Sequence, residues 1–233
     1  MSLFLAFVLT LISALVWLRL VDFMALKGFI SSQLSRKIIH IGTGPIFVLC
    51  WLMFPQVPAS RFVAAVVPLL ITVQFFLIGI GIIKDQAAVE AMSRSGDPKE
   101  ILKGPLIYGI MFVLLTILFW KNHPAGIIGL MVLCGGDGLA DIVGRRIKSR
   151  PIPWSKTKTL AGTIAMFLGS FLMTILILWI FIRAGIFSLS FESITGRIVL
   201  LSILAAIIET VPVKDFDNLS VPIVVVLAGL ALF

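Results

Sequence analysis

The chain has 233 residues, of which 60% are hydrophobic and 13% are charged, and it carries a formal net charge of +8 at pH 7. Soluble domains are nearer half apolar and a quarter charged, so this composition excludes an ordinary soluble domain and any disordered or fibrous protein. Apolar stretches of the roughly 20 residues that a membrane span requires recur along the whole chain. We therefore expect an all-α polytopic membrane protein, a bundle of about seven or eight transmembrane helices in which residues 1–233 form a single domain.

The hydropathy pattern places eight candidate spans along the chain, of which the fifth and the last are the weakest. In order, they cover residues 2–23, 38–54, 62–83, 105–120, 124–143, 160–182, 198–213 and 220–233. The first begins at Ser2 without a preceding basic region or an Ala-x-Ala-type cleavage signal. This favours a retained span over a secretory signal peptide.

Basic residues are distributed unevenly between the connections that join these spans. Of the nineteen Lys and Arg residues, fourteen fall in the first, third, fifth and seventh connections and four in the second, fourth and sixth. Basic loops stay on the cytoplasmic side, so we expect the odd-numbered connections there and both termini on the opposite side. This uneven distribution of basic residues argues against nucleic acid as a partner. No transit peptide is evident, which favours a prokaryotic inner membrane or a thylakoid membrane.

Acidic residues gather on the same face. Ten of the eleven lie in the odd-numbered connections or at the adjoining ends of spans. Because a topological bias needs no acids, their presence indicates a polar site at the cytoplasmic face. Arg36 and His40, four residues apart at the start of the second span, would border that site on one helix face. A single interfacial His is nevertheless more often structural.

The fifth span contains two carboxylates, Asp137 and Asp141, among glycines. A carboxylate at membrane depth costs several kcal/mol unless it is paired, ligated or hydrated. At i and i+4 the two acids share a helix face, where their like charges favour a cation between or near them. Mg²⁺ fits, because it prefers a few carboxylates together with substrate phosphates. The alternative is a structural ion pair between Asp141 and Arg145.

Two further features of this region have open interpretations. Gly135, Gly136 and Gly138 would let backbone amides approach a phosphate, or would form a notch for helix packing. The basic loop at 145–158 would form a cradle for the phosphates of a nucleotide, or would attract lipid headgroups.

Taken together, these segments resemble the phytol kinase branch of the polyprenol kinase family, whose other members include dolichol kinases and CTP-dependent diacylglycerol kinases. The resemblance runs from Arg36 to Pro222 and rests on an ordered set of motifs. These are Arg36-Lys37-Ile38-Ile39-His40, Leu102-Lys103-Gly104-Pro105-Leu106-Ile107-Tyr108, the segment Gly135 to Arg146, Lys158-Thr159-Leu160-Ala161-Gly162-Thr163, Glu209-Thr210-Val211-Pro212 and Asp217-Asn218-Leu219-Ser220-Val221-Pro222. Ala161, where dolichol and diacylglycerol kinases usually have Glu, favours the phytol or farnesol branch.

The resemblance implies a kinase of isoprenoid metabolism, including tocopherol biosynthesis, that transfers the γ-phosphoryl group of CTP, or of another nucleoside triphosphate, to a long isoprenoid alcohol. Phytol is the expected acceptor, with geranylgeraniol or farnesol as alternatives. Asp137 and Asp141 would hold Mg²⁺, and His40, Glu209, Asp215 or Asp217 would act as the base. The donor would be bound by Arg36, Lys37, Gly135, Gly136, Gly138, Arg145, Arg146, Lys156, Lys158, Thr159, Gly162 and Asn218. The remaining alternatives are a cytidylyltransferase that forms a CDP-lipid and a cation- or proton-coupled transporter.

Overall fold

The computed structural model describes residues 1–93, 95–211 and 217–233, and the side chains of all these residues except Ser32, Ala91 and Lys156. Most of this chain is helical, as expected. In order, the elements are α1 (Leu3–Leu26), α2 (Ser32–Cys50), η1 (Trp51–Met53), α3 (Ser60–Gly79), α4 (Gln86–Met92), η2 (Pro98–Leu102), α5 (Gly104–Leu118), α6 (Pro124–Met131), η3 (Val132–Gly136), α7 (Asp137–Arg146), β1 (Pro151–Ile152), β2 (Ser155–Thr159), α8 (Leu160–Arg183), α9 (Phe191–Glu209) and α10 (Asp217–Leu232).

Within the described residues, six helical segments are long and apolar enough to cross a membrane. They correspond to α1, α3, η2 with α5, α6 through α7, α8 and α9. The other two expected spans are also helices: α2 begins with a polar, basic turn, and α10 is a shorter apolar helix. The all-α polytopic fold is therefore confirmed.

The seventh span begins earlier than expected. Helix α9 starts at Phe191, because the Ser190 side chain caps it by accepting a hydrogen bond from the Ser193 amide. An acidic residue in the first turn, Glu192, suits the positive end of the helix dipole. The polar stretch before residue 198 thus belongs to the helix and not to the preceding loop.

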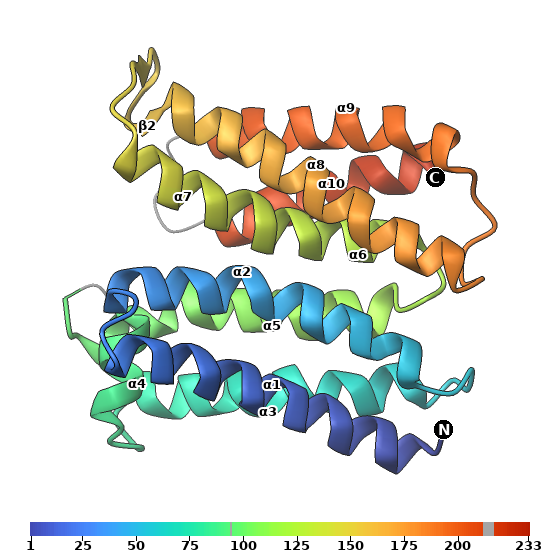
Figure 1. Ribbon diagram of the computed structural model, residues 1–233, viewed down its shortest axis with the longest axis horizontal. Coiled ribbons are helices and arrows are strands. Elements are labelled where there is room, and N and C mark those ends of the chain that lie inside the picture. The colour runs from blue at the N-terminus through green and yellow to red at the C-terminus, as the bar shows by residue number, and fades with distance from the viewer. Residues whose placement is uncertain (94, 212–216) are drawn as a thin grey trace.

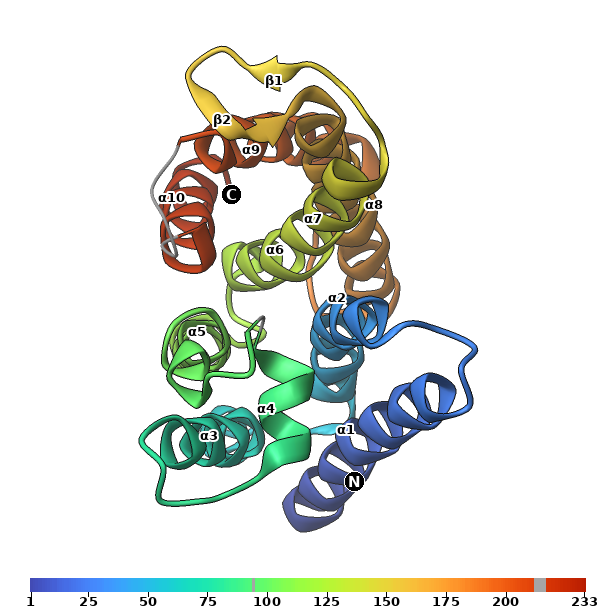
Figure 2. The same ribbon diagram turned by 90° about the vertical axis from the view of Figure 1, so that its left-hand side faces the viewer.

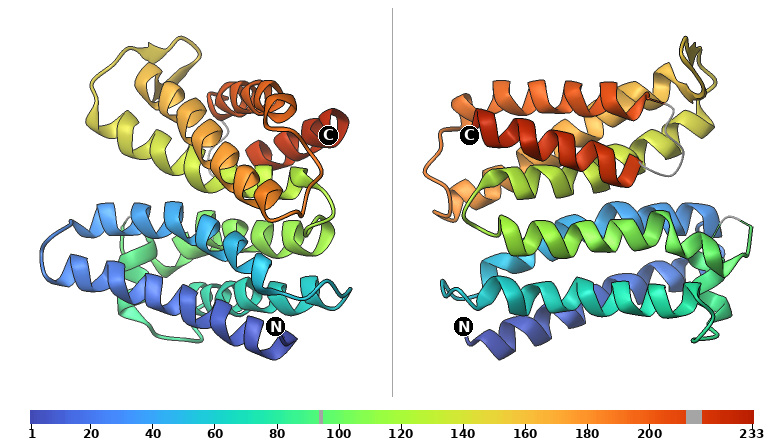
Figure 3. Two further views of the ribbon diagram at one scale, coloured as in Figure 1. Left: turned by 45° about the vertical axis from the view of Figure 1, so that its right-hand side comes forward. Right: turned by 180° about the vertical axis from the view of Figure 1, so that it is seen from behind.

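The helices form two groups that lie against each other (Figure 1). One group contains α1 to α5 and the other contains α6 to α10. Views from two further sides show the same division (Figure 3). The segment from α6 to α7 is the most enclosed of the six, with 72% of its apolar window buried, so most of it packs against other parts of the protein.

Both termini lie at one end of the bundle (Figure 1). At the opposite end, α1 joins α2, α3 joins α5 through α4 and η2, and α7 joins α8 through the β1–β2 hairpin. We call this second end the basic end, because it carries the first, third and fifth connections with their Lys and Arg residues. The first six connections therefore alternate between the two ends of the bundle, as expected, and the seventh falls on residues 212–216, outside the described part of the chain.

Candidate active site

A large cavity of about 1400 Å³ opens at the basic end, between the two groups of helices. Acidic side chains from many elements line it, as the clustering of acids on one face predicted: Asp22, Asp85, Glu90, Glu100, Asp137, Asp141, Glu209 and Asp217. The cavity also brings together most of the site residues expected from the sequence. Besides those acids, they are Arg36, Lys37, His40, Arg145, Lys158, Thr159, Gly162 and Asn218.

Two polar contacts join α2 to α7 at residues that line this cavity. Nζ of Lys37 lies 2.9 Å from Oδ2 of Asp141, whose Oδ1 accepts a hydrogen bond of 2.7 Å from Nε of Arg145. One turn earlier on α7, Oδ2 of Asp137 lies 3.4 Å from Nε2 of His40. The ion pair between Asp141 and Arg145, which was the structural alternative to Mg²⁺ binding, is therefore present. A second cation, Lys37 of α2, also contacts Asp141.

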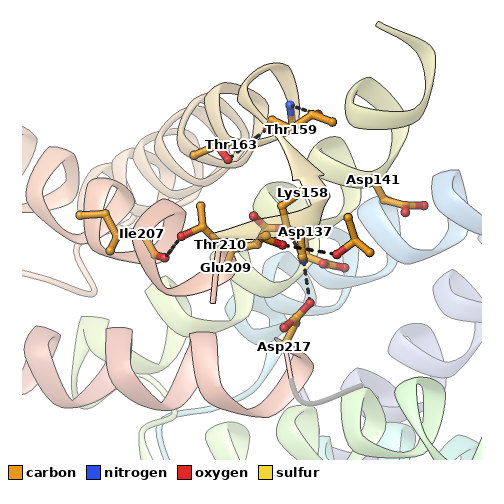
Figure 4. A network of polar contacts seen from close by, with 12 residues as sticks. Asp137, Asp141, Lys158, Thr159, Thr163, Ile207, Glu209, Thr210 and Asp217 are labelled. Atoms are coloured by element: carbon orange, nitrogen blue, oxygen red, sulfur yellow. Dashed lines mark hydrogen bonds and ion pairs between the residues drawn. The ribbon is translucent and has the colours of Figure 1, made fainter. Parts of the chain in front are cut away.

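Lys158 connects three elements that are distant in sequence (Figure 4). From β2, its Nζ donates to Oε1 of Glu209 at the end of α9 and, over 2.7 Å, to Oδ2 of Asp217 at the start of α10. Burial alone would lower the pKa of Lys158, but these two carboxylates raise it above its usual value. Lys158 therefore stays protonated, and the two acids proposed as bases are held in ion pairs.

The start of α8 lies beside the acids of α7. Oγ1 of Thr159 caps α8 by accepting a hydrogen bond of 3.3 Å from the Gly162 amide. A Cβ atom on Gly144 would lie only 3.4 Å from Cα of Gly162, so α7 and α8 approach closely at this point. The first three amides of α8 are already engaged within the protein, because those of Leu160, Ala161 and Gly162 donate to the Arg150 carbonyl, to Oγ of Ser149 and to Oγ1 of Thr159. The start of α8 therefore lies close to α7 without offering these amides to an anion.

The three glycines of α7 and its preceding turn occupy helix contacts. A Cβ atom would meet Gly169 of α8 at Gly135, Ser170 of α8 at Gly136 and Ile41 of α2 at Gly138. None of the three lines the cavity, and neither does Arg146. The contacts of these glycines thus match the second of the two interpretations, a notch for helix packing, since small residues let membrane helices approach closely.

Two of the expected residues fall outside the description. The side chain of Lys156 is not described, and Asp215 lies in the range 212–216, which the structure does not describe. Asn218 does line the cavity, but its Nδ2 donates a hydrogen bond of 3.1 Å to the carbonyl of Gly104, which connects α10 to α5.

Tyr108 is a site residue that the sequence reasoning did not assign. Its hydroxyl donates a hydrogen bond of 2.8 Å to the carbonyl of His40 and lies 3.1 Å from Sγ of Cys134. Its ring centroid is 4.4 Å from that of His40. Tyr108 is the single tyrosine of the chain and ends one of the quoted motifs, which was the available signal.

The donor set can be compared with the needs of Mg²⁺. Within the described residues, no group of three or more His, Cys, Asp and Glu side chains gathers as a complete metal cage. Mg²⁺ is normally held by one or two carboxylates together with phosphates and water, so Asp137 and Asp141 fit as partial ligands that a nucleotide would complete.

Away from α7, much of the cavity lining is apolar, although Arg19 and Asp22 of α1 and Gln74 of α3 also line it. The apolar part is formed by side chains of α1, α3 and α5, including Leu15, Leu18, Ile71, Phe75 and Phe112. A single cavity therefore has a charged side next to α7, β2 and α9 and an apolar side that extends into the membrane-spanning part of the bundle.

Comparison with known proteins identifies relatives over most of the chain. The chain is 38% identical over 217 residues to a probable phytol kinase 1 of rice (Oryza sativa subsp. japonica), covering 92% of this chain and 69% of the relative. It is 36% identical over 205 residues to phytol kinase 1 of Arabidopsis thaliana, covering 87% and 67%. It is 37% identical over 209 residues to farnesol kinase of the same plant, covering 89% and 68%. No family model and no solved structure matches.

These relatives correct the expected location. All three are chloroplastic proteins of plants, so the expectation of a prokaryotic membrane is wrong. The charge bias indicates which connections share a face of a membrane, and it contains no information about which organism or organelle supplies that membrane.

Proposed function

The chain belongs to the phytol kinase branch of the polyprenol kinase family, and we propose that it transfers the γ-phosphoryl group of CTP to the hydroxyl group of phytol. Prenyl alcohol kinase activity follows from the family. The identity of the donor, the preferred acceptor and the roles of the residues are the parts that we propose here.

The observation that carries the proposal is the dual character of the cavity. Cations and carboxylates meet on one side, where the cations suit the phosphates of a nucleotide. Apolar side chains of three membrane-spanning helices line the other side, where they suit an isoprenoid chain. Substrates from water and from the bilayer would thus meet between α2 and α7.

On the charged side, we assign the donor's phosphates to Lys37 and Arg145, which both line the cavity. These groups offset negative charge and align the γ-phosphoryl group, which is most of what phosphoryl transfer requires. Asp137 and Asp141 would hold Mg²⁺, which supplies charge neutralisation on the donor's phosphates when it is bound. Lys37 and Arg145 keep Asp141 in place before substrates arrive.

In the reaction, the acceptor oxygen bonds to the γ-phosphorus while the bond from that phosphorus to the β–γ bridging oxygen breaks. The products are a prenyl monophosphate and CDP, and the hydroxyl proton passes to the protein. We assign this proton to His40, which lines the cavity with Nε2 at 3.4 Å from Oδ2 of Asp137. Glu209 and Asp217 are weaker candidates because Lys158 engages both carboxylates. A loose transition state places little demand on the base.

The test is phosphoryl transfer by the purified full chain in detergent, with γ-labelled CTP or ATP and with phytol, farnesol or diacylglycerol, in the presence and absence of Mg²⁺. We expect phytyl phosphate as the main product, formed with CTP and only with Mg²⁺. Absence of a labelled prenyl phosphate from every pairing, in protein shown to be folded, would overturn the proposal. Equal use of ATP would overturn the assignment of the donor alone.

A pair of variants tests the site. Asp137→Asn keeps the size of the side chain but removes its charge, and we expect a loss of about 100-fold or more in kcat, the range seen when a group that stabilises developing charge is removed. Glu192→Gln is the matched control, because Glu192 is an exposed acid at the other end of the bundle. Normal turnover by Asp137→Asn would refute the role of this carboxylate.

A further inference from the structure

The apolar side of the cavity is a defined space between four helices, which we call the apolar arm. Its walls are Ala14, Leu15 and Leu18 of α1, Thr43 of α2, Pro68, Ile71 and Phe75 of α3, and Gly109 and Phe112 of α5. At 1.5 Å per residue, the cavity-lining run from Leu26 to Ala14 spans about 18 Å along the axis of α1. The arm therefore reaches well into the roughly 30 Å of a hydrocarbon core.

Helix α4 covers the arm at the basic end. Figure 2, which looks onto this end, shows α4 in the middle of the space bounded by α1, α2, α3 and α5. Val89 anchors it in a small buried cluster with Ile78 of α3 and Ile101 of η2. Nη1 of Arg36 donates a hydrogen bond of 2.9 Å to the carbonyl of Ser93, which connects the end of α4 to α2. The cover places a polar surface above an apolar interior.

The arm and the charged site are continuous. His40 lines the same cavity one turn before Thr43 on α2, and Tyr108 lines it one turn before Phe112 on α5. Polar residues on the walls lie towards the basic end: Arg19 and Asp22 of α1 are nearer to it than Ala14, and Gln74 of α3 is nearer to it than Pro68 and Ile71. Polarity therefore decreases along the arm from the reaction centre towards the membrane interior.

We infer that the isoprenoid chain of the acceptor lies in the apolar arm, with its hydroxyl at His40 and Asp137, and that Ala14, Thr43, Pro68 and Phe112 form the far end against which the chain is measured. This inference rests on the proposed function, and it assigns chain-length specificity to residues of α1, α2, α3 and α5. The hydroxyl is the one polar group of such an alcohol, and the meeting point with the charged site is where it finds polar partners.

The arm selects by shape and not by hydrophobic gain. An isoprenoid alcohol already resides among lipid tails, and transfer from lipid to an apolar protein surface provides no hydrophobic driving force. Filling the far end of the arm would therefore exclude the last part of a long chain or push its hydroxyl away from the reaction centre. A displacement of about 1 Å at a reacting atom can reduce the rate about 100-fold.

The test compares two variants of α1 with acceptors of different length. Ala14→Phe adds an aromatic ring at the far end of the arm, whereas Val16→Phe adds one on the same helix at a residue that is 59% exposed and does not line the cavity. For each, kcat/KM is measured with phytol and with geraniol, which has half as many carbons. We expect Ala14→Phe to lower the ratio of phytol to geraniol by tenfold or more, and Val16→Phe to leave this ratio as in the wild type.

The outcomes separate this inference from the proposed function. An unchanged ratio in Ala14→Phe, with the wild type still making phytyl phosphate, overturns the arm but not the kinase. Equal loss with both alcohols in Ala14→Phe also overturns it. If the wild type phosphorylates no prenyl alcohol, the proposed function fails and the arm fails with it.

A second measurement uses the unaltered protein, so that folding of a variant is not at issue. A prenyl alcohol with a diazirine at the end of its chain is photolysed with the wild type, and the labelled peptides are identified by mass spectrometry. We expect the label on peptides of α1, α3 or α5. Labelling confined to α8, α9 or α10 would overturn the inference.

Discussion

Lys158 offers the sharpest test of the charged side, because its replacement removes a cation that contacts both Glu209 and Asp217. The perturbation is Lys158→Met, which keeps a chain of similar length without the charge. The Glu209 side chain is only 6% exposed, so its carboxylate would be left in a poorly solvated place without this cation.

The size of the effect follows from that burial. Removal of one partner from a buried ion pair costs about 3–5 kcal/mol. Asp217 and Lys158 are more exposed than Glu209, at 26% and 21%, so we take the lower end, about 3 kcal/mol. In a chain of this size, that corresponds to a decrease of about 6–12 °C in the apparent melting temperature.

The assay is thermal unfolding of the purified protein in detergent, with three variants beside the wild type. Lys148→Met is the control, because it removes an exposed Lys from the same basic loop. Lys158→Met with Glu209→Gln should recover much of the lost stability, since a neutral amide needs no cation. A wild-type melting temperature for Lys158→Met, or a double variant no more stable than the single one, would refute the reasoning.

The stability that Lys158 contributes through these contacts has a defined pH dependence. Because the folded-state pKa of Lys158 is raised above its usual value, its stabilising contribution is fully present below the unfolded-state pKa. It is lost only as the pH rises through the folded-state pKa, above the usual lysine value of about 10.4. The contribution of Lys158 to stability is therefore the same at pH 7 and at pH 9. Any difference between the melting temperatures of the wild type at these two pH values should also be found in Lys158→Met.

Three further predictions concern packing, positioning and the metal. Gly136→Ala should destabilise the protein by about 1–3 kcal/mol, because its Cβ would collide with Ser170, whereas Gly196→Ala, with open space around it, should not; equal melting temperatures for the two variants would contradict the packing role. Tyr108→Phe keeps the ring on His40 but loses a hydrogen bond of about 1 kcal/mol, so kcat should fall about fivefold and KM for CTP should not change; an unchanged kcat would argue against positioning. Chelation with EDTA should abolish activity and added Mg²⁺ should restore it, and activity that persists in EDTA would exclude the metal.

The spans were predictable because the hydropathy and charge of consecutive residues are enough to locate them. The elements that shape the cavity were not. Helix α4 has only seven residues, and the β1–β2 hairpin is held by few backbone pairs, so neither gives a clear periodic signal. Both nevertheless supply cavity walls, with Ala87, Ala88, Thr157 and Lys158 among the lining residues.

The contacts of the candidate site also fall into two kinds, those that residue spacing predicts and those that it does not. The spacing of Asp137, Asp141 and Arg145 fixed their common helix face, and the structure shows the contact between the last two. The contacts of Lys37 with Asp141, and of Lys158 with Glu209, join residues more than fifty positions apart. Such contacts depend on how helices pack, and residue spacing along a single chain contains no direct measure of that packing.

The turn before α7 explains why one glycine-rich segment both packs and supports a polar site. Val132–Gly136 is a π-helical turn, which inserts an extra residue into the helix. Because an α-helix rotates by about 100° per residue, this insertion turns the face of α7 relative to that of α6. Every residue of α6 is buried, yet Asp137 and Asp141 face the cavity while Gly135 and Gly136 face α8. Leu133, within the same turn, accepts a hydrogen bond of 3.1 Å from Nε2 of His40, so the irregular backbone also fixes the imidazole beside Asp137.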